Sequence, residues 1–229
     1  MLSITLNCNI TKVILKYFNA LVKLVNMEYS IEQGSKLVAA ARNSIELYLT
    51  INNFDRKMIE RTITEHDNNN GVFVTIEHYP TRTLRGCMGF VEPKEKFSKA
   101  LIDAAIAAAA EDSRFVPVSH MEFEHMIVEV SILDKPKLIT ASTEIAIKNN
   151  IKLGRDGLIL KYGYHEAILL PNVPIENNWT KEKYLDNLCI KAGLKEHIWK
   201  TGQARLYTFT AHIFREKEPR GEIEEVNKL

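Results

Sequence analysis

Residues 72–90 read VFVTIEHYPTRTLRGCMGF, and this stretch decides the fold class. Its first half is rich in β-branched and aromatic residues, which favour a β-strand. A short turn at residues 80–83 leads directly into a second strand. Two strands joined by so short a turn must be antiparallel, because parallel neighbours need a longer crossover. The stretch therefore predicts a β-hairpin.

Further strands and helices are predicted on both sides of this hairpin. Helices are expected where apolar residues recur at helical spacing or a capping residue opens the run, after residues 30–33 and at 97–109, 143–148 and 180–192. Strands are expected at residues 126–133, 158–162, 167–170 and 204–214. In the first of these, Glu129 and Ser131 alternate with apolar residues, which predicts one wet face. Short turns between strand pairs favour an α+β fold, with a largely antiparallel sheet flanked by helices, over a doubly wound α/β fold.

The chain divides into three segments by composition. Residues 1–26 carry apolar residues at helical spacing with lysines between them, which predicts an amphipathic N-terminal extension that packs or binds a partner. The lysines interrupt it well short of the roughly 20 apolar residues that a membrane span needs. Residues 27–216, with Met27 as a second plausible start, form the folded domain. Residues 217–229 are a charged tail that we expect to be frayed.

Overall composition limits the function classes. The 229 residues are 45% hydrophobic, and 30 Lys and Arg balance 29 Asp and Glu to a net charge of +1. With so small a net charge, the protein as a whole has no electrostatic attraction to nucleic acid or to an anionic membrane. Three cysteines lie far apart with no C-x-x-C pair, which argues against a disulfide framework and a zinc ribbon. A reducing, cytoplasmic setting fits best.

One cysteine lies in an unusual sequence, at residues 84–89, LRGCMG. In a regular strand Arg85 and Cys87 would share one face, so the guanidinium could lower the thiol pKa. Gly86 and Gly89 permit positive φ angles and close approach, and could let the backbone surround an oxyanion or a phosphate. Three interpretations stay open: Cys87 is a small buried hydrophobe, Cys87 is a nucleophilic or redox thiol, or Arg85 leads an anion-binding loop.

Other candidate residues lie farther along the chain. Asp112 and Arg114 follow an alanine-rich helix, either as a hydrogen-bonded turn or with Asp112 as a carboxylate that orients a substrate. Asn172 lies in the proline-bounded stretch LPNVP. His120 and His125 are five apart, which does not place two metal ligands on one helical face. This spacing leaves no metal site predicted, and because no G-x-G-x-x-G or Walker motif is present, no cofactor is predicted either.

At these residues the chain resembles the AMMECR-type domain family, whose hallmark is the hexapeptide Leu-Arg-Gly-Cys-Ile-Gly. Residues 84–89 match it with Met88 in place of isoleucine, and GVFVTI, AAAEDSRFVPV, VEVSIL, LPNV and KAGL follow the family's order. The resemblance covers about residues 27–216. One segment departs from the family's Gly-Leu-Leu-Leu-Pro-Gln-Val, with Ala167 at the glycine and Asn172 at the glutamine.

The resemblance implies a two-lobed fold with a cleft near the hexapeptide. It also implies an association with Memo-like and radical-SAM proteins, as in a modification pathway. With the residues above, it leads to the hypothesis of an enzyme whose cysteine nucleophile acts on a small anionic substrate. The alternative is a non-catalytic binding or scaffold module for a partner protein or RNA. The predicted catalytic residues are Cys87 and Asp112, and the predicted substrate-binding residues are Arg85, Gly86, Gly89, Arg114 and Asn172.

Overall fold

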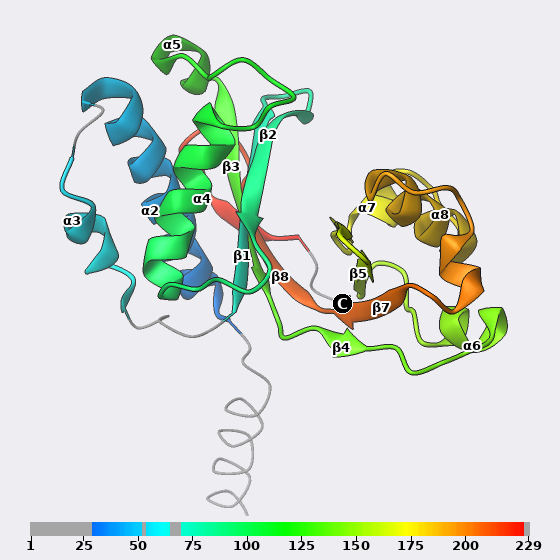
Figure 1. The fold of residues 1–229 in the computed structure, drawn as a ribbon. Coiled ribbons are helices and arrows are strands. Elements are labelled where there is room, and N and C mark those ends of the chain that lie inside the picture. Colours follow the sequence, from blue (N-terminus) through cyan, green and yellow to red (C-terminus); the bar gives the residue numbers. More distant parts are fainter. Residues whose placement is uncertain (1–28, 52–53, 65–69, 227–229) are drawn as a thin grey trace, which may run out of the picture. The chain divides into compact units, whose positions relative to one another are not determined.

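The fold is described from a computed structural model, which describes residues 29–51, 54–64 and 70–226. The predicted helix at residues 1–26 lies outside the described residues, as does Cys8. Helices and two antiparallel sheets make up the described part (Figure 1). The predicted α+β class with antiparallel sheets is therefore confirmed.

A five-stranded sheet contains the predicted hairpin. Its strand order is β2-β1-β3-β8-β9, and every neighbouring pair is antiparallel. The strands are β1 (Gly71–His78), β2 (Thr83–Phe90), β3 (Met126–Leu133), β8 (Ala211–Glu216) and β9 (Ile223–Glu225). Strand β2 therefore lies at one edge, so the hexapeptide has a partner strand on one side only.

Two long helices cover one face of this sheet. They are α2 (Ile31–Ile51) and α4 (Phe97–Ala110), which contact each other and the strands beneath them (Figure 1). Both were predicted from helical spacing, and their apolar faces are buried, as at Leu37 and Leu101. The short helices α3 (Arg56–Glu60) and α5 (His120–Phe123) contact α2.

A second, four-stranded sheet has its own hydrophobic core. Its order is β4-β7-β5-β6, with strands β4 (Lys137–Leu138), β5 (Gly157–Tyr162), β6 (His165–Leu169) and β7 (Arg205–Phe209). The associated helices are α6 (Glu144–Asn149), α7 (Val173–Glu176), α8 (Lys181–Lys191) and the 3₁₀ helix η2 (Ile198–Thr201). Tyr184, Leu188 and Trp199 are fully buried in the core against strand residues such as Leu160. The division into two lobes with a cleft stays a prediction.

The expected strand at residues 204–214 is in fact two strands, β7 and β8, which belong to different sheets (Figure 1). The break falls at Thr210, whose carbonyl oxygen accepts a hydrogen bond from the Asp134 N–H at 2.9 Å. Asp134 itself follows β3 on the way to β4. Two chain segments that run between the sheets are thus joined at one point, which the continuous β-propensity of the sequence does not indicate.

Two other expectations were wrong for the same sheet. Every residue of β3 is buried, including Glu129 and Ser131, because β3 is a central strand with both faces covered. The tail is ordered through residue 226, since β9 pairs with β8 and the Val226 N–H donates to the Ile213 carbonyl at 2.8 Å.

Among the described residues, no helix has the length and apolar content needed to cross a membrane.

Candidate functional site

The hexapeptide strand contains a β-bulge that decides where its side chains point. Gly86 pairs with Ile76 and Leu84 pairs with Glu77, so Arg85 is an extra residue without a cross-strand partner. A bulge of this kind changes the alternation of faces along a strand. The predicted placement of Arg85 and Cys87 on one face, which assumed a regular strand, is therefore wrong.

The Arg85 guanidinium is part of a partly buried ion pair on the other side of the strand. Its Nε donates to Glu122 Oε1 at 2.6 Å, and an NH2 group donates to the Val116 carbonyl at 2.8 Å. Glu122 lies in α5 and also closes a capping box with Ser119. Arg85 does not line the pocket beside Cys87, so it holds α5 and the loop before it against the sheet. Residues 120–123 thus form a short helix with a structural role.

The two glycines of the hexapeptide serve close packing rather than an unusual backbone. Neither adopts a positive φ, which corrects the expectation that they surround an anion in that conformation. A Cβ on Gly86 would lie 2.0 Å from the Ala108 carbonyl oxygen of α4. A Cβ on Gly89 would lie 2.2 Å from the Val72 carbonyl oxygen. Gly86 therefore lets the alanine-rich helix α4 approach the sheet.

Cys87 follows Gly86 and points to the opposite face, where it lines a pocket of about 680 Å³. The residue is half-buried rather than sealed in the core, and its Sγ accepts a hydrogen bond from Thr75 Oγ1 at 3.4 Å. Apolar and charged residues from both sheets and from the segments next to them line the same pocket; they include Phe73, Leu84, Glu77, Arg82, Ile168, Leu170 and Glu176. The thiol is thus presented to a cavity large enough for a small molecule.

Asp112 and Arg114 form the wall next to the thiol. Asp112 Oδ2 accepts the Cys87 N–H at 2.9 Å and an Arg114 NH2 at 2.6 Å, while Oδ1 accepts Arg114 Nε at 2.9 Å. The Arg114 hydrogen bonds and the backbone N–H groups outweigh burial and lower the pKa of Asp112 to about 2. Asp112 is therefore ionised and unsuited as a base at neutral pH. The hydrogen-bonded turn considered for it is present, and it holds Arg114 at the pocket.

Charges around Cys87 act in both directions on its pKa. Burial raises the pKa of the thiol most strongly, and the Glu129 carboxyl also raises it. The Thr75 hydrogen bond and the charges of Lys191 and Arg114 lower it. The net direction is upward, so the resting group is a protonated thiol.

Sequence reasoning missed the acidic residues on the same face of the sheet. Thr75 of β1 has Cys87 and Glu129 as its partners on the two neighbouring strands. Glu129 is 3% exposed and lines the pocket, and its nearest charged partner is Arg215, with NH1 at 3.5 Å from Oε2. Burial first and then the nearby Glu77 raise the pKa of Glu129 to about 8. A glutamate inside the apolar run MIVEVSIL was the available signal, but the alternation suggested a wet face.

Residues next to the second sheet complete the pocket. Asn172, a predicted binding residue, lines it and donates from Nδ2 to Glu176 Oε1 at 2.9 Å. Lys191, at the end of α8, also lines it, and burial lowers the pKa of its ammonium. The structure thus brings Cys87, Asp112, Arg114 and Asn172 together, while Arg85 lies elsewhere and the two glycines shape the backbone.

Metal-type side chains occur together elsewhere in the described residues, at Glu182, Asp186 and His197. Lys200 lies 2.6 Å from Glu182, and Asp186 accepts hydrogen bonds from His197 Nδ1 and Trp199 Nε1, both at 2.8 Å. These partners already satisfy the ligand atoms, and the group is separate from the Cys87 pocket.

Comparison with known proteins agrees with the hexapeptide. The sequence model of the AMMECR1 family matches residues 38–214. The chain belongs to the AMMECR1 family. Protein MJ0810 of Methanocaldococcus jannaschii is 43% identical over 201 residues, which cover 87% of this chain and 98% of that protein. Protein PYRAB00100 of Pyrococcus abyssi is 44% identical over 198 residues, covering 84% and 94%.

A solved structure supports the fold. The crystal structure of uncharacterized protein PH0010 from Pyrococcus horikoshii matches with a TM-score of 0.80 and 41% sequence identity. The match covers 86% of this chain and 97% of that one. These relatives carry no functional names, so a function for the AMMECR1 pocket has to be argued from its chemistry.

Proposed function

We propose that this AMMECR1-family protein is an enzyme whose pocket binds a small anionic substrate and whose Cys87 thiol adds to an electrophilic carbonyl carbon of it. The observation that carries the proposal is a half-buried thiol that lines a cavity of about 680 Å³ together with Arg114 and Lys191. Both cations favour the thiolate electrostatically. The same charges would hold an anionic group of the substrate next to the sulfur.

Addition of the Cys87 thiol to a carbonyl requires a proton donor for the carbonyl oxygen and a base for the thiol proton. Glu129 can be both. Its pKa of about 8 keeps it mostly protonated at neutral pH, close to the value at which a group gives and takes protons well. Cys87 and Glu129 flank Thr75 on adjacent strands, so their backbones are about 10 Å apart and leave room for a substrate above Thr75. Sulfur bonds to the carbonyl carbon, Glu129 gives its proton to the carbonyl oxygen, and its carboxylate takes the thiol proton.

Two buried acceptors suggest the chemistry of the rest of the substrate. Glu77 Oε2 and Asn172 Oδ1 are buried at the pocket and have no hydrogen-bond partner among the described protein groups. Buried acceptors of this kind are stabilised when a donor reaches them. A substrate with an amine or amide N–H at some distance from its anionic group would satisfy both ends of the pocket.

Alkylation of Cys87 tests the anionic preference without knowledge of the substrate. Iodoacetate carries a carboxylate and iodoacetamide is its neutral counterpart, so their rate ratio at Cys87 reports the local charge. We expect this ratio to exceed that of glutathione by about tenfold, which corresponds to about 1.4 kcal/mol of favourable charge interaction. Peptide mass spectrometry separates Cys87 from the buried Cys189. A ratio equal to that of glutathione would refute the anionic site.

Two further measurements test the charge of Lys191 and the proton transfer by Glu129 separately. Lys191→Gln should lower the ratio, while Lys195→Gln, an exposed lysine outside the pocket, should leave it unchanged. Glyoxylate, the smallest anionic aldehyde, should protect Cys87 from iodoacetamide by forming the thiol adduct, and Glu129→Gln should remove the protection. Protection that survives Glu129→Gln would eliminate the proposed proton transfer.

The alternative is a non-catalytic binding or scaffold module for a partner protein or RNA. It predicts that Cys87→Ala retains all activity of the protein in cells, whereas the enzyme proposal predicts its loss. A place in the cytoplasm, which rests on the cysteine pattern, fits the enzyme proposal. An association with Memo-like and radical-SAM proteins in a modification pathway also fits it and rests on the family resemblance. Co-purification of these proteins with the chain is the corresponding measurement.

A further inference from the structure

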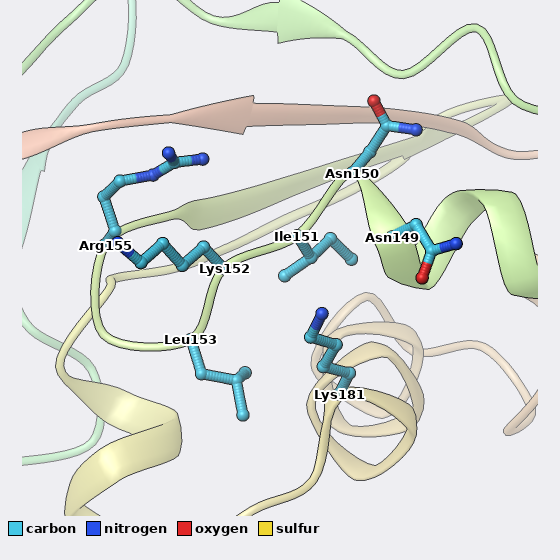
Figure 2. Close-up of a pocket in the computed structure, with 7 residues that line it drawn as sticks. All are labelled: Asn149, Asn150, Ile151, Lys152, Leu153, Arg155 and Lys181. Carbon is cyan, nitrogen blue, oxygen red and sulfur yellow. The ribbon is translucent and has the colours of Figure 1, made fainter.

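A second pocket, of about 460 Å³, lies beside the start of α8 and is separate in its lining from the Cys87 pocket (Figure 2). Seven residues line it: Asn149, Asn150, Ile151, Lys152, Leu153, Arg155 and Lys181. Cationic and carboxamide side chains dominate, and no acidic residue is among them. We propose that this pocket binds a small phosphorylated compound, with Lys152 and Lys181 as its main charged contacts.

The two lysines carry charge that the protein does not neutralise. Within the described part of the chain, neither Lys152 nor Lys181 forms an ion pair. The nearby carboxylates are already engaged: Asp156 with Arg155 at 2.7 Å, and Glu182 with Lys200 at 2.6 Å. An anionic ligand would therefore meet an unpaired ammonium group at each end of the pocket.

Lys181 is held in place before any ligand arrives. Its Nζ donates to the Lys148 carbonyl oxygen at 2.9 Å, across from α8 to the end of α6. Figure 2 shows the side chain extending from α8 toward the loop that carries residues 149–153. An ammonium has three N–H donors, so two stay available. Fixing this long side chain in advance lowers the entropy that binding would otherwise lose.

The loop that forms the other side of the pocket is also preorganised. The buried Asp156 carboxylate accepts the Lys152 N–H at 2.7 Å, and the Asp156 N–H donates to the Lys152 carbonyl at 2.9 Å. Arg155 binds both oxygens of Asp156 through Nε and one NH2 group, which leaves its NH1 donors free. The loop therefore presents Lys152 and Arg155 from a closed, hydrogen-bonded turn.

The arrangement favours phosphate over a single carboxylate. Lys152 and Arg155 lie at one end of the pocket in Figure 2 and Lys181 at the other, with Ile151 between them. A phosphate dianion offers more charge and more acceptor oxygens than a carboxylate, and ammonium groups bind it as point charges. The first turn of the 11-residue helix α8 adds the positive end of its dipole beside Lys181.

Titration calorimetry with inorganic pyrophosphate tests the site. We expect saturable binding to the wild-type protein, and Lys152→Gln and Lys181→Gln should each weaken it about tenfold, the effect of losing one charge-assisted contact. Lys183→Gln is the matched control, because this exposed lysine of α8 does not line the pocket. A dissociation constant above about 10 mM, or equal weakening by all three variants, would refute a specific site.

Two more experiments test where pyrophosphate binds and whether the site prefers phosphate to other anions. Cys87→Ala and Lys191→Gln should leave pyrophosphate binding unchanged, and loss of binding in either would place the anion in the thiol pocket and refute the second site. Citrate should bind more weakly than pyrophosphate at equal ionic strength. Tighter citrate binding would overturn the phosphate assignment.

Discussion

Two glutamates of the five-stranded sheet are buried to the same degree and have opposite surroundings. Glu129 of β3 is 3% exposed and Glu216 of β8 is 2% exposed. Both would strongly destabilise the fold as unpaired charges. In the same sheet, Glu216 lies in a network that stabilises the fold, whereas Glu129 lies in an environment suited to proton transfer.

Glu216 is fully paired. Its two oxygens accept hydrogen bonds from Arg42 Nε and NH2, both at 2.5 Å, and Oε2 also accepts the Val128 N–H at 2.9 Å. Arg42 in turn donates to the Met126 carbonyl at 2.6 Å and lies over the Phe123 ring. This network joins α2 to β3 and β8, so Glu216 contributes to stability.

Glu129 has a weaker set of partners. Arg215 is its closest cation, at 3.5 Å, and shares its charge with Glu224 at 2.9 Å. The neighbouring Glu77 and Glu176 add repulsion, which together with burial raises the pKa of Glu129. An incompletely paired, buried carboxyl next to a pocket is the arrangement found at sites of proton transfer. The difference between the two glutamates is thus in their partners and not in their depth.

The largest expected effect follows from breaking the complete network. Glu216→Gln leaves the Arg42 charge buried without its counterion, and should lower the free energy of unfolding by about 3–5 kcal/mol. Urea denaturation followed by circular dichroism measures it. Glu222→Gln is the control, because its pair with Lys217 is exposed and should contribute little to stability. A Glu216→Gln loss below that of the control would contradict the assignment.

The incompletely paired glutamate should affect stability through pH. Because the folded-state pKa of Glu129 is about 8, above its value in the unfolded chain, the folded protein holds a proton that the unfolded chain has lost between these two values. The contribution of Glu129 to stability is then fully present below the pKa of the unfolded chain and falls as pH rises toward 8, by at most about 1.4 kcal/mol per pH unit. Glu129→Gln should remove this slope between pH 6 and 8.

Glu124 provides the matched control for that measurement. Its pKa is lowered to about 2 by the Arg220 hydrogen bond, so it is ionised in both states throughout this pH range. Glu124→Gln should therefore leave the slope as in the wild-type protein. If Glu129→Gln and the wild-type protein have equal slopes, Glu129 is not protonated in the fold at pH 6.

Much of the fold follows from local patterns in the sequence. The hairpin, α2, α4 and α8 were predicted, because apolar periodicity and caps such as Thr180 act within a few residues. The division of residues 204–214 between two sheets was missed, because it depends on the contact of Thr210 with Asp134, 76 positions earlier. The tail strand β9 was missed for a different reason: its partner β8 directly precedes it in the chain, but two of its three residues are glutamates, which have low strand propensity.

The candidate site was predicted only in part. The hexapeptide indicated Cys87, and the EDSR stretch indicated Asp112 and Arg114, which lie beside the thiol. Face assignment failed where the bulge at Arg85 interrupts the strand, because the glycines allow a bulge but do not show at which residue the regular alternation of faces breaks. Glu129 was missed because a glutamate in an alternating strand normally faces water.

The smallest effects should separate Arg85 from the pocket. Arg85→Gln removes the ion pair with Glu122, which is 31% exposed, and should lower stability by about 1.5–3 kcal/mol. Since Arg85 points away from the pocket, the ratio of iodoacetate to iodoacetamide alkylation at Cys87 should not change. Lys191→Gln should do the reverse, changing stability by less than about 0.5 kcal/mol but lowering the ratio, because Lys191 is a partly exposed residue that lines the pocket. If Arg85→Gln lowered this alkylation ratio and left the unfolding free energy equal to that of the wild type, Arg85 would have to be counted as a residue of the Cys87 pocket.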